Sequence, residues 1–313
     1  MTASLTAQAA SADEISAYIA ASTKAAWGVE GLPAGTALKS IKKVGVLGAG
    51  TMGGGISMNF ANVGIEVTIV EVQEAALERG LGVIRKNYQN SADKGRFPQE
   101  EVGIRMGLLK GTLNRADLAD CDLIIEAIFE DMAIKKEIFA DLDKIAKPGC
   151  ILASNTSYLD INEIASVTKR PQDVIGLHFF SPANVMKLLE IVRAKPTSDS
   201  VVATPLDLAK TIGRAAALAR VCPGFIGNRM LARRQQAAAY LVQAGAMPWD
   251  IDAAFNKFGF KMGPFQMSDL AGLDIGWKPG AKTANPLRDM ICERTPRRGQ
   301  KSGAGYYDYD ENR

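Results

Sequence analysis

A glycine-rich stretch near the start of the chain constrains the fold more than any other feature. Residues 43–56 read KVGVLGAGTMGGGI, an apolar run followed by Gly48, Gly50 and Gly53. The apolar run predicts a buried strand, and residues 51–63 predict a helix. Glycines at this spacing permit a tight turn, close approach of the main chain to a pyrophosphate, and close packing of helix on strand. The stretch therefore predicts a strand-turn-helix unit whose helix N-terminus faces phosphates.

An alternation of apolar runs and helical patterns continues from Ile41 to about residue 221. Further strands are expected at 66–70, 123–127 and 150–153, because short apolar runs there are bounded by polar residues. This order of strands and helices is typical of a parallel sheet with right-handed crossovers. The sequence therefore predicts an α/β fold, a Rossmann-type doubly wound, mostly parallel sheet.

Glu71 stands at the carboxyl end of the second expected strand, eighteen residues after Gly53. A carboxylate at this position accepts hydrogen bonds from both ribose hydroxyls of an adenosine and repels the 2′-phosphate of NADP. The alternative is an ordinary solvated glutamate at a strand end. Its place relative to the glycine turn favours the cofactor contact, so we expect NAD.

A polar turn follows the strand expected at 150–153. It consists of Ser154, Asn155, Thr156 and Ser157. In open α/β sheets ligands bind outside the carboxyl ends of the strands, so these hydroxyl and amide groups lie where chemistry would occur. Capping of a helix at 161–167 explains the same residues about as well. Both interpretations stay open.

The only histidine of the chain, His178, lies in an apolar run at 174–180, and a second run at 185–192 carries Glu190. The short polar loop between the runs predicts a hairpin. A lone histidine on an apolar strand is more often a packed core residue than a catalytic one. The glutamate favours catalysis, because a carboxylate on an apolar strand needs a partner and supports an imidazolium. Oxidation of an alcohol by NAD also needs a base that works near neutral pH.

The remaining segments predict mainly helices and loops. Helices are expected at 74–90, 132–145 and 204–212, a polar segment through Lys94, Gly95 and Pro98, and a strand at 217–221. Beyond that strand the pattern becomes helical, at 225–244, 249–258 and 266–270, with Asn228 in the first turns.

The chain also begins with a separate helical arm. A helix is expected at 11–27, capped by Ser11 and Glu14, and a linker with Gly31 at 28–40. The helix carries Ile15, Tyr18, Ile19 and Ala26 on one face, which predicts docking on the main body. We therefore expect three parts: an arm and linker at 1–40, an NAD-binding domain at 41–221, and a helical C-terminal domain at 222–313 for substrate binding and dimerisation.

Composition excludes several classes of protein. The 313 residues are 47% hydrophobic and carry a net charge of +3, so neither nucleic acid nor a membrane surface is expected as a partner. Four scattered cysteines fit reduced thiols better than disulfides or a metal site, and no metal is expected. Without an apolar run of membrane length, a secretory signal or a peroxisomal C-terminal tripeptide, we expect a cytoplasmic protein.

Taken together, the motifs resemble the L-3-hydroxyacyl-CoA dehydrogenase family. The resemblance runs from about Ile41 to Tyr309, nearly the whole chain beyond the arm. Its motifs occur in order along the chain: VGVLGAGTMGGGI, EAIFED, SNTSYL, LHFFSP, MKLLE, PGFIGNR, MGPFQMSDLAGLD and GQKSGAGYYDY. The family oxidises the 3-hydroxyl of an acyl-CoA with NAD in fatty acid β-oxidation, so the resemblance implies this reaction and these ligands.

The resemblance also implies roles for particular residues. His178 would be the general base and Glu190 its partner, while Ser157 and Asn228 would hold the substrate oxygens. Lys94 would contact the coenzyme A part of the substrate. The residues implied to line the NAD site are Gly48, Gly50, Thr51, Met52, Gly53, Glu71, Glu130, Lys135, Asn155 and Ser157.

The sequence is closest to one branch of this family. Ser181 after HFF, the stretch GLDIGWK and the ending GQKSGAGYYDYD are similar to the dehydrogenase part of multifunctional β-oxidation enzymes. In such enzymes a hydratase part precedes the dehydrogenase through a helical linker, which the arm resembles. The resemblance therefore implies either a homodimer or a module of a larger enzyme.

Two other functions are compatible with an NAD-binding fold of this plan. One is a dehydrogenase of a small free 3-hydroxy acid, in which a lysine of the helical domain does the proton chemistry. The other is a non-enzymatic NAD-binding relative. The set Ser157, His178, Glu190 and Asn228 disfavours the first, and a charged pair on apolar strands disfavours the second.

Overall fold

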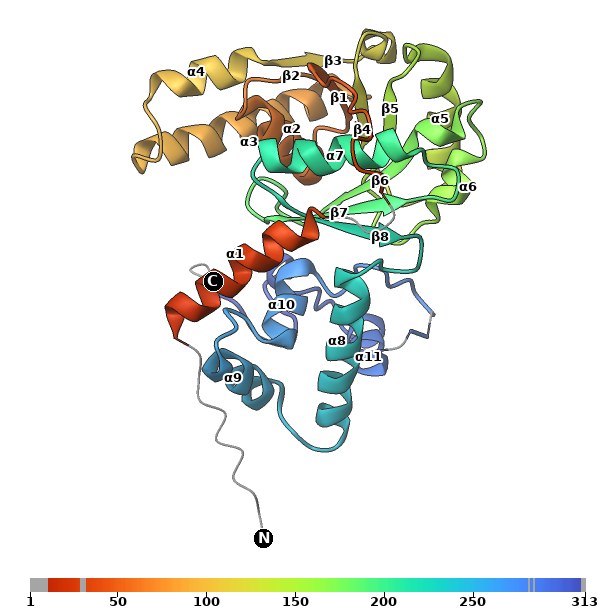
Figure 1. Cartoon of the computed structure of the whole chain (residues 1–313). Helices are drawn as coiled ribbons and strands as arrows, with labels where there is room; N and C mark the ends of the chain where they lie inside the picture. The colour runs from red at the N-terminus through yellow and green to blue at the C-terminus, as the bar shows by residue number, and fades with distance from the viewer. Residues whose placement is uncertain (1–10, 29–31, 281, 284, 311–313) are drawn as a thin grey trace. The chain divides into compact units, whose positions relative to one another are not determined.

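An eight-stranded sheet forms the centre of the larger part of the molecule in the computed structural model (Figure 1). Its order is β3-β2-β1-β4-β5-β6-β7-β8, and every neighbouring pair is parallel except β6 with β7. The strands are β1 Lys43–Leu47, β2 Glu66–Val70, β3 Leu109–Thr112, β4 Leu123–Glu126, β5 Ile151–Ser154, β6 Val174–Phe179, β7 Leu188–Arg193 and β8 Ala215–Arg220. The predicted doubly wound sheet is confirmed, and its order reverses between β1 and β4, where ligands bind in such sheets.

The structure describes residues 11–28, 32–280, 282–283 and 285–310, and these fall into two compact units. The first ends at Phe225 and the second begins at Ile226. The first ten residues of the predicted arm, and Gly31 of its linker, lie outside the described residues. The finer division predicted between residues 221 and 222 stays a prediction.

Helices cover both faces of the sheet in the first unit (Figure 1). They are α1 Ala12–Ala26, α2 Thr51–Ala61, α3 Glu74–Asp93, α4 Glu100–Gly107, α5 Met132–Ile145, α6 Ile161–Ala165 and α7 Asp199–Thr211. Residues of α2, α3 and α7 share one hydrophobic core with the sheet, and residues of α5 and α6 share the other. Because β4 and β5 supply alternate side chains to the two cores, nearly every residue of these strands is apolar.

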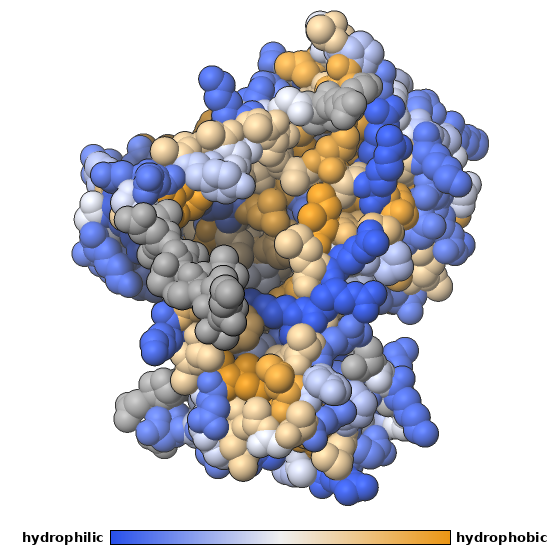
Figure 2. Space-filling model, turned by 60° about the horizontal axis from the view of Figure 1, so that its bottom comes forward, coloured by the Kyte–Doolittle hydropathy of each residue, from blue (hydrophilic) through white to orange (hydrophobic). Residues whose placement is uncertain are grey.

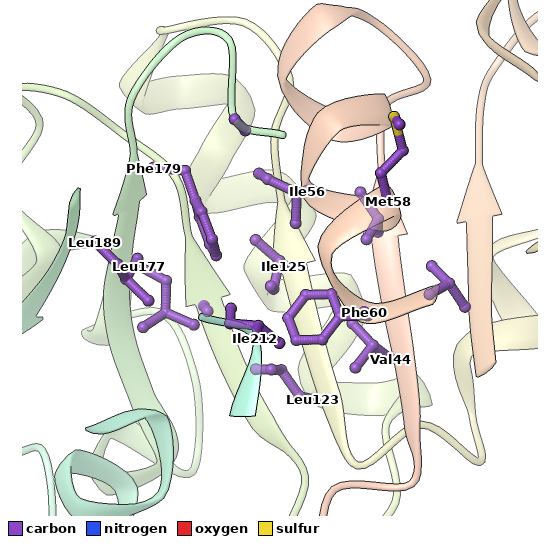
Figure 3. Packing of buried hydrophobic residues seen from close by; sticks show 14 of the residues in the cluster. Val44, Ile56, Met58, Phe60, Leu123, Ile125, Leu177, Phe179, Leu189 and Ile212 are labelled. Carbon is purple, nitrogen blue, oxygen red and sulfur yellow. The ribbon is translucent and has the colours of Figure 1, made fainter. Parts of the chain in front are cut away.

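The core under α2 shows how the sheet carries the site. Ile56 of α2 lies beside Ile125 of β4 and Phe179 of β6, and all three are at most 2% exposed (Figure 3). Burial of side chains of this size contributes roughly 1.5–3 kcal/mol each. This packing fixes the carboxyl ends of β4 and β6 relative to the glycine turn.

Several predicted elements need correction. The segment from Lys94 onward is a loop only as far as Gln99, after which α4 and β3 follow, neither of which the sequence predicted. Helix α7 begins at Asp199, five residues before the predicted start, and Pro205 lies inside it. The capped helix α1 is confirmed, with Ser11 and Glu14 forming a capping box. Helix α1 contacts β8, as docking on the main body predicts, but its apolar side chains Ile15, Tyr18 and Ile19 are exposed.

The second unit is helical, as predicted for the C-terminal part. It contains α8 Gly227–Gln243, α9 Pro248–Phe258, α10 Pro264–Ala271 and α11 Pro286–Arg294, of which the sequence missed α11. Few apolar residues of α11 gather on one face of the helix, so its hydrophobic periodicity is weak.

Two buried carboxylates hold the second unit together. Asp269 of α10 accepts hydrogen bonds from the backbone N–H groups of Tyr306 and Tyr307, at 2.8 and 3.0 Å, and from the hydroxyl of Tyr309 at 2.8 Å. Asp252 of α9 likewise accepts from two backbone N–H groups at the start of α10 and from the hydroxyl of Tyr307. Burial, reinforced by these carboxylates, raises the pKa of the hydroxyls of Tyr307 and Tyr309 and keeps them protonated as donors.

Replacing Asp269 by Asn should lower the free energy of unfolding of the second unit by roughly 2–4 kcal/mol. The amide offers fewer acceptor sites to three donors and loses the charge that strengthens each bond. Urea unfolding followed by tryptophan fluorescence measures this, because Trp249 and Trp277 lie in this unit and only Trp27 lies in the first.

The matched control is Asp308→Asn. Its side chain is 83% exposed beside Arg297, so the loss should stay below about 1 kcal/mol. An unchanged urea midpoint for Asp269→Asn would contradict the structural role of this carboxylate.

Candidate active site

The glycine turn between β1 and α2 depends on two positions where a side chain cannot fit. Gly48 has a φ of +100°, and a Cβ atom there would lie 2.8 Å from the carbonyl oxygen of Ala127. At Gly53 a Cβ atom would lie 1.9 Å from the carbonyl oxygen of Gly48. Only glycine is compatible with these contacts. They bring the start of α2, with Thr51 and Met52, directly onto the end of β1.

Gly50 meets a different condition. No atom lies within 4 Å of the place where its Cβ would be, so the protein itself does not require glycine there. The open space adjoins the free N–H groups of the first turn of α2, which favour an anion. A pyrophosphate therefore fits at this position, as the sequence predicted from the spacing of the glycines.

A cavity of about 530 Å³ opens beside this turn. Gly50, Thr51 and Glu71 line one part of it, and the turn that contains Asn184 lines another. The carboxylate of Glu71 accepts hydrogen bonds from the N–H groups of Ala49 at 3.0 Å and Val72 at 2.8 Å. These bonds hold the carboxylate at the mouth of the glycine turn, so the residues present fit an adenosine ribose and NAD.

The cavity also brings in residues that the sequence analysis missed. Arg79, Val83 and Asn87 of α3 line it. Their spacing of four residues places them on one face of the helix, and this spacing was the available signal. Lys94, by contrast, is exposed at the C-terminal cap of α3 and does not line this cavity. Its contact with coenzyme A stays a prediction.

A buried ion pair lies behind the next strand end. Lys135 of α5 is 1% exposed, and its Nζ lies 2.7 and 2.8 Å from the two carboxylate oxygens of Glu126, a buried residue of β4. The same carboxylate accepts a hydrogen bond from the hydroxyl of Ser154 at 2.7 Å. The signal for this pair was a charged residue inside the apolar strand LIIE, because a buried charge requires a partner.

The polar turn after β5 is held from two sides. The Oδ1 atom of Asn155 accepts a hydrogen bond from the backbone N–H of Phe179 at 2.8 Å. The Oε1 atom of Glu130 accepts from the hydroxyl of Thr156 at 2.6 Å and from the backbone N–H of Ser157 at 2.9 Å. The expected role of Asn155 and Glu130 in binding NAD stays a prediction, since both side chains are engaged by protein groups here.

His178 and Glu190 face each other across the antiparallel pair β6 and β7, in direct register. His178 Nδ1 lies 2.7 Å from Glu190 Oε2, and Nε2 lies 3.2 Å from the hydroxyl oxygen of Ser157. His178 is 3% exposed and Glu190 is fully buried. The three residues that the sequence picked out separately therefore form one continuous chain of contacts.

Two aromatic rings pack against the imidazole. The ring centroids of Phe180 and Phe225 lie 4.4 and 5.7 Å from that of His178. Phe225 is buried and has a φ of 46°, an unusual value for a residue other than glycine. These rings exclude water from the imidazole on the sides they cover, which strengthens its bond to Glu190.

Asn228 belongs to the second unit, where it is the second residue of α8 and half-buried. Its contact with the substrate stays a prediction. In the described part of the chain, no three histidine, cysteine or acidic residues are grouped so that they could hold a metal ion. Nor does that part contain a helix long and apolar enough to cross a membrane. All four cysteines are free, and burial raises the pKa of Cys121 and Cys150 to about 12.

The fold and this site define a class of protein, a two-domain dehydrogenase that binds a dinucleotide at the carboxyl edge of its sheet. A family model described as the NAD binding domain of 3-hydroxyacyl-CoA dehydrogenase matches residues 43–222, and one described as the C-terminal domain matches residues 224–309. The chain therefore belongs to the 3-hydroxyacyl-CoA dehydrogenase family. This confirms the predicted family, the enzyme class and NAD as the cofactor.

Individual relatives agree with the family. The chain is 44% identical over 297 residues to the peroxisomal bifunctional enzyme of Cavia porcellus, covering 88% of this chain and 40% of that one. It is 40% identical to the peroxisomal fatty acid beta-oxidation multifunctional protein MFP2 of Arabidopsis thaliana, covering 88% and 39%. The chain thus spans about 40% of the length of these curated relatives. The solved structure of FadB2 from M. tuberculosis has a TM-score of 0.81 at 37% identity, covering 87% of this chain and 100% of that one.

The expectation of a cytoplasmic protein is wrong. The curated relatives reported above are named peroxisomal enzymes, which contradicts this expectation. That expectation rested on missing targeting signals, and a targeting signal is an address that the fold does not encode.

Replacing Gly50 by Ala should raise the dissociation constant of NADH about tenfold or more without lowering thermal stability. The added methyl group enters the open space above the turn and blocks close approach of the pyrophosphate. Titration of NADH fluorescence gives the dissociation constant, and a thermal melt gives the stability.

Gly82→Ala on α3 is the control, because its Cβ position is equally open but does not line the cavity. It should leave NADH binding unchanged. Equal NADH affinity in Gly50→Ala and the wild type would count against this placement of the pyrophosphate.

Proposed function

We propose that the chain catalyses the reversible, NAD-dependent oxidation of L-3-hydroxyacyl-CoA to 3-ketoacyl-CoA in fatty acid β-oxidation. The observation that carries the proposal is the buried chain of contacts from Glu190 through His178 to Ser157. It supplies a base, a partner for that base and a hydroxyl at one strand edge. Membership of the family and the names of the β-oxidation relatives support the substrate class.

The mechanism follows from the protonation of the imidazole. The carboxylate of Glu190 accepts a hydrogen bond from the N–H at Nδ1 of His178, which leaves Nε2 as a hydrogen-bond acceptor. In this tautomer the hydroxyl of Ser157 donates to Nε2. A substrate 3-hydroxyl that replaces the Ser157 hydroxyl as the donor to Nε2 can give its proton to that nitrogen. The buried charge of Glu190 stabilises the imidazolium that forms.

The cofactor site of this proposal lies along the same sheet edge as the base, with β4 and β5 between β1 and β6. The turn at Gly48, Gly50 and Gly53 would hold the pyrophosphate of NAD, and Glu71 its adenosine ribose. NAD, when bound, supplies the hydride acceptor for the reaction. In this proposal Asn228 of the second unit holds a substrate oxygen, an assignment that rests on the family motif PGFIGNR.

Replacing His178 by Gln should lower kcat for reduction of acetoacetyl-CoA by roughly 10²- to 10⁴-fold, because the general base and acid is lost. The dissociation constant of NADH should change little. Glu190→Gln should be less severe. In the reduction direction the imidazolium donates the proton, so this variant should move the alkaline limb of the pH-rate profile to lower pH, since the imidazolium loses its anionic partner. Steady-state assays that follow NADH absorbance measure both.

The choice of substrate separates the proposal from its alternatives. Wild-type protein should oxidise 3-hydroxybutyryl-CoA and leave 3-hydroxyisobutyrate unreacted. Preference for the free acid, or full turnover by His178→Gln, would show that the proposed reaction is wrong. A series of 3-ketoacyl-CoA substrates of increasing chain length then defines the acyl pocket.

We also propose that the chain forms a homodimer through its second unit. Six large apolar side chains of that unit are more than half exposed: Met230, Tyr240, Trp249, Phe258, Leu270 and Ile275. Hydrophobic residues gather at the surface of the face shown in Figure 2. Exposed apolar groups in such number favour an interface, and a second copy of the same chain is the commonest partner.

Light scattering at micromolar concentration should give a molar mass of twice the 33.4 kDa of one chain. Phe258→Glu, at the most exposed of these six side chains, should weaken the dimer because it places a charge in an apolar contact. Val83→Glu is a control for added charge, because it lies on α3 of the first unit. A monomer in the wild type would favour the alternative, a module of a larger multifunctional enzyme.

A further inference from the structure

Glu130 makes contacts that the proposed reaction does not use. Its Oε1 atom accepts three hydrogen bonds, from the hydroxyl of Thr156 at 2.6 Å and from the backbone N–H groups of Ser157 at 2.9 Å and Tyr158 at 3.1 Å. All three donors belong to the turn after β5, which contains neither helix nor strand. Glu130 therefore supplies to this turn the acceptor that a regular element would otherwise provide.

A buried cation stands behind this carboxylate. The ammonium group of Lys135 lies 3.6 Å from Glu130 Oε2 and contacts both oxygens of Glu126. The side chain of Lys135 is 1% exposed and that of Glu130 is 40% exposed. One ammonium thus serves two carboxylates, a buried one in β4 and a partly exposed one in the following loop. Without it the two negative charges would repel each other.

The consequence falls on Ser157. Its backbone N–H is fixed by Glu130, and its hydroxyl lies 3.2 Å from Nε2 of His178. We infer that Glu130 is a positioning residue that fixes Ser157 against His178, with Lys135 and Glu126 holding its carboxylate from behind. This inference rests on the proposed function, because Glu130 would affect turnover only through the catalytic role of Ser157.

The inference separates Glu130 from a simple cofactor ligand. A residue that only binds NAD changes the dissociation constant of NADH and leaves turnover at saturating NADH intact. A residue that positions Ser157 lowers kcat, since a small displacement of a reacting group is costly. The three hydrogen bonds that Glu130 Oε1 accepts from the turn support the second role.

The experiment compares Glu130→Ala with Glu130→Gln in the full chain. Glu130→Ala should lower kcat, measured at saturating NADH, about 10- to 100-fold; the dissociation constant of NADH, measured by fluorescence, sets the saturating concentration. Glu130→Gln keeps an amide oxygen for the three donors and should recover most of the lost kcat. It also tests the inference if the alanine variant fails to fold.

A double-mutant cycle with Ser157→Ala gives the sharpest readout. In the Ser157→Ala background, Glu130→Ala should lower kcat little further, because its effect passes through Ser157. Glu163→Ala is the matched control. It removes a carboxylate that pairs with Lys136, the neighbouring lysine of α5, at the exposed surface, and it should leave kcat unchanged.

Two results would overturn the inference. One is a raised dissociation constant of NADH with unchanged kcat in Glu130→Ala, which would make Glu130 a cofactor ligand. The other is an equal loss of kcat in both backgrounds, which would show that Glu130 acts independently of Ser157. Failure of the proposed function looks different, because Ser157→Ala and His178→Gln would then keep full turnover.

Discussion

The site depends on the burial of a histidine and a carboxylate in direct register on two antiparallel strands. Glu190 is fully buried, and an isolated charge in such a place is unfavourable unless a partner compensates it. His178 meets this condition at 2.7 Å, and the pairing of β6 with β7 keeps the two residues opposite each other. A one-residue slip of the register would turn either side chain to the opposite face of the sheet. Catalytic geometry and correct strand pairing are therefore one requirement.

The parallel part of the sheet meets a second requirement, which is to bring separate segments to one edge. The turns after β1, β4 and β5 all leave the sheet at its carboxyl end, and they carry Gly50, Glu130 and Ser157. Apolar packing of α2 against β4 and β6 holds this edge rigid (Figure 3). The polar groups at this edge form hydrogen bonds with one another, so the edge stays ordered where it must remain open to ligands.

Much of this arrangement follows from the sequence, and the limits have physical causes. Buried strands such as β4 are continuous apolar runs, so their existence and order were predictable. His178 and Glu190 were recognisable because polar residues stand out in such runs. The hold of Glu130 on the turn after β5 was not predictable, since it depends on a loop conformation that no periodicity encodes. Helix α4 and strand β3 were missed because they are short and only partly buried.

Two buried pairs of side chains of opposite character lie near this edge of the sheet. Lys135 and Glu126 are joined by two hydrogen bonds of 2.7 and 2.8 Å, and this pair suits a scaffold. In His178 and Glu190 one partner is an imidazole, the group that serves as general base in the proposed reaction. Only the second pair takes up a proton in the proposed reaction. Glu130 and Ser157 connect the two pairs, because Glu130 contacts Lys135 and Ser157 contacts His178.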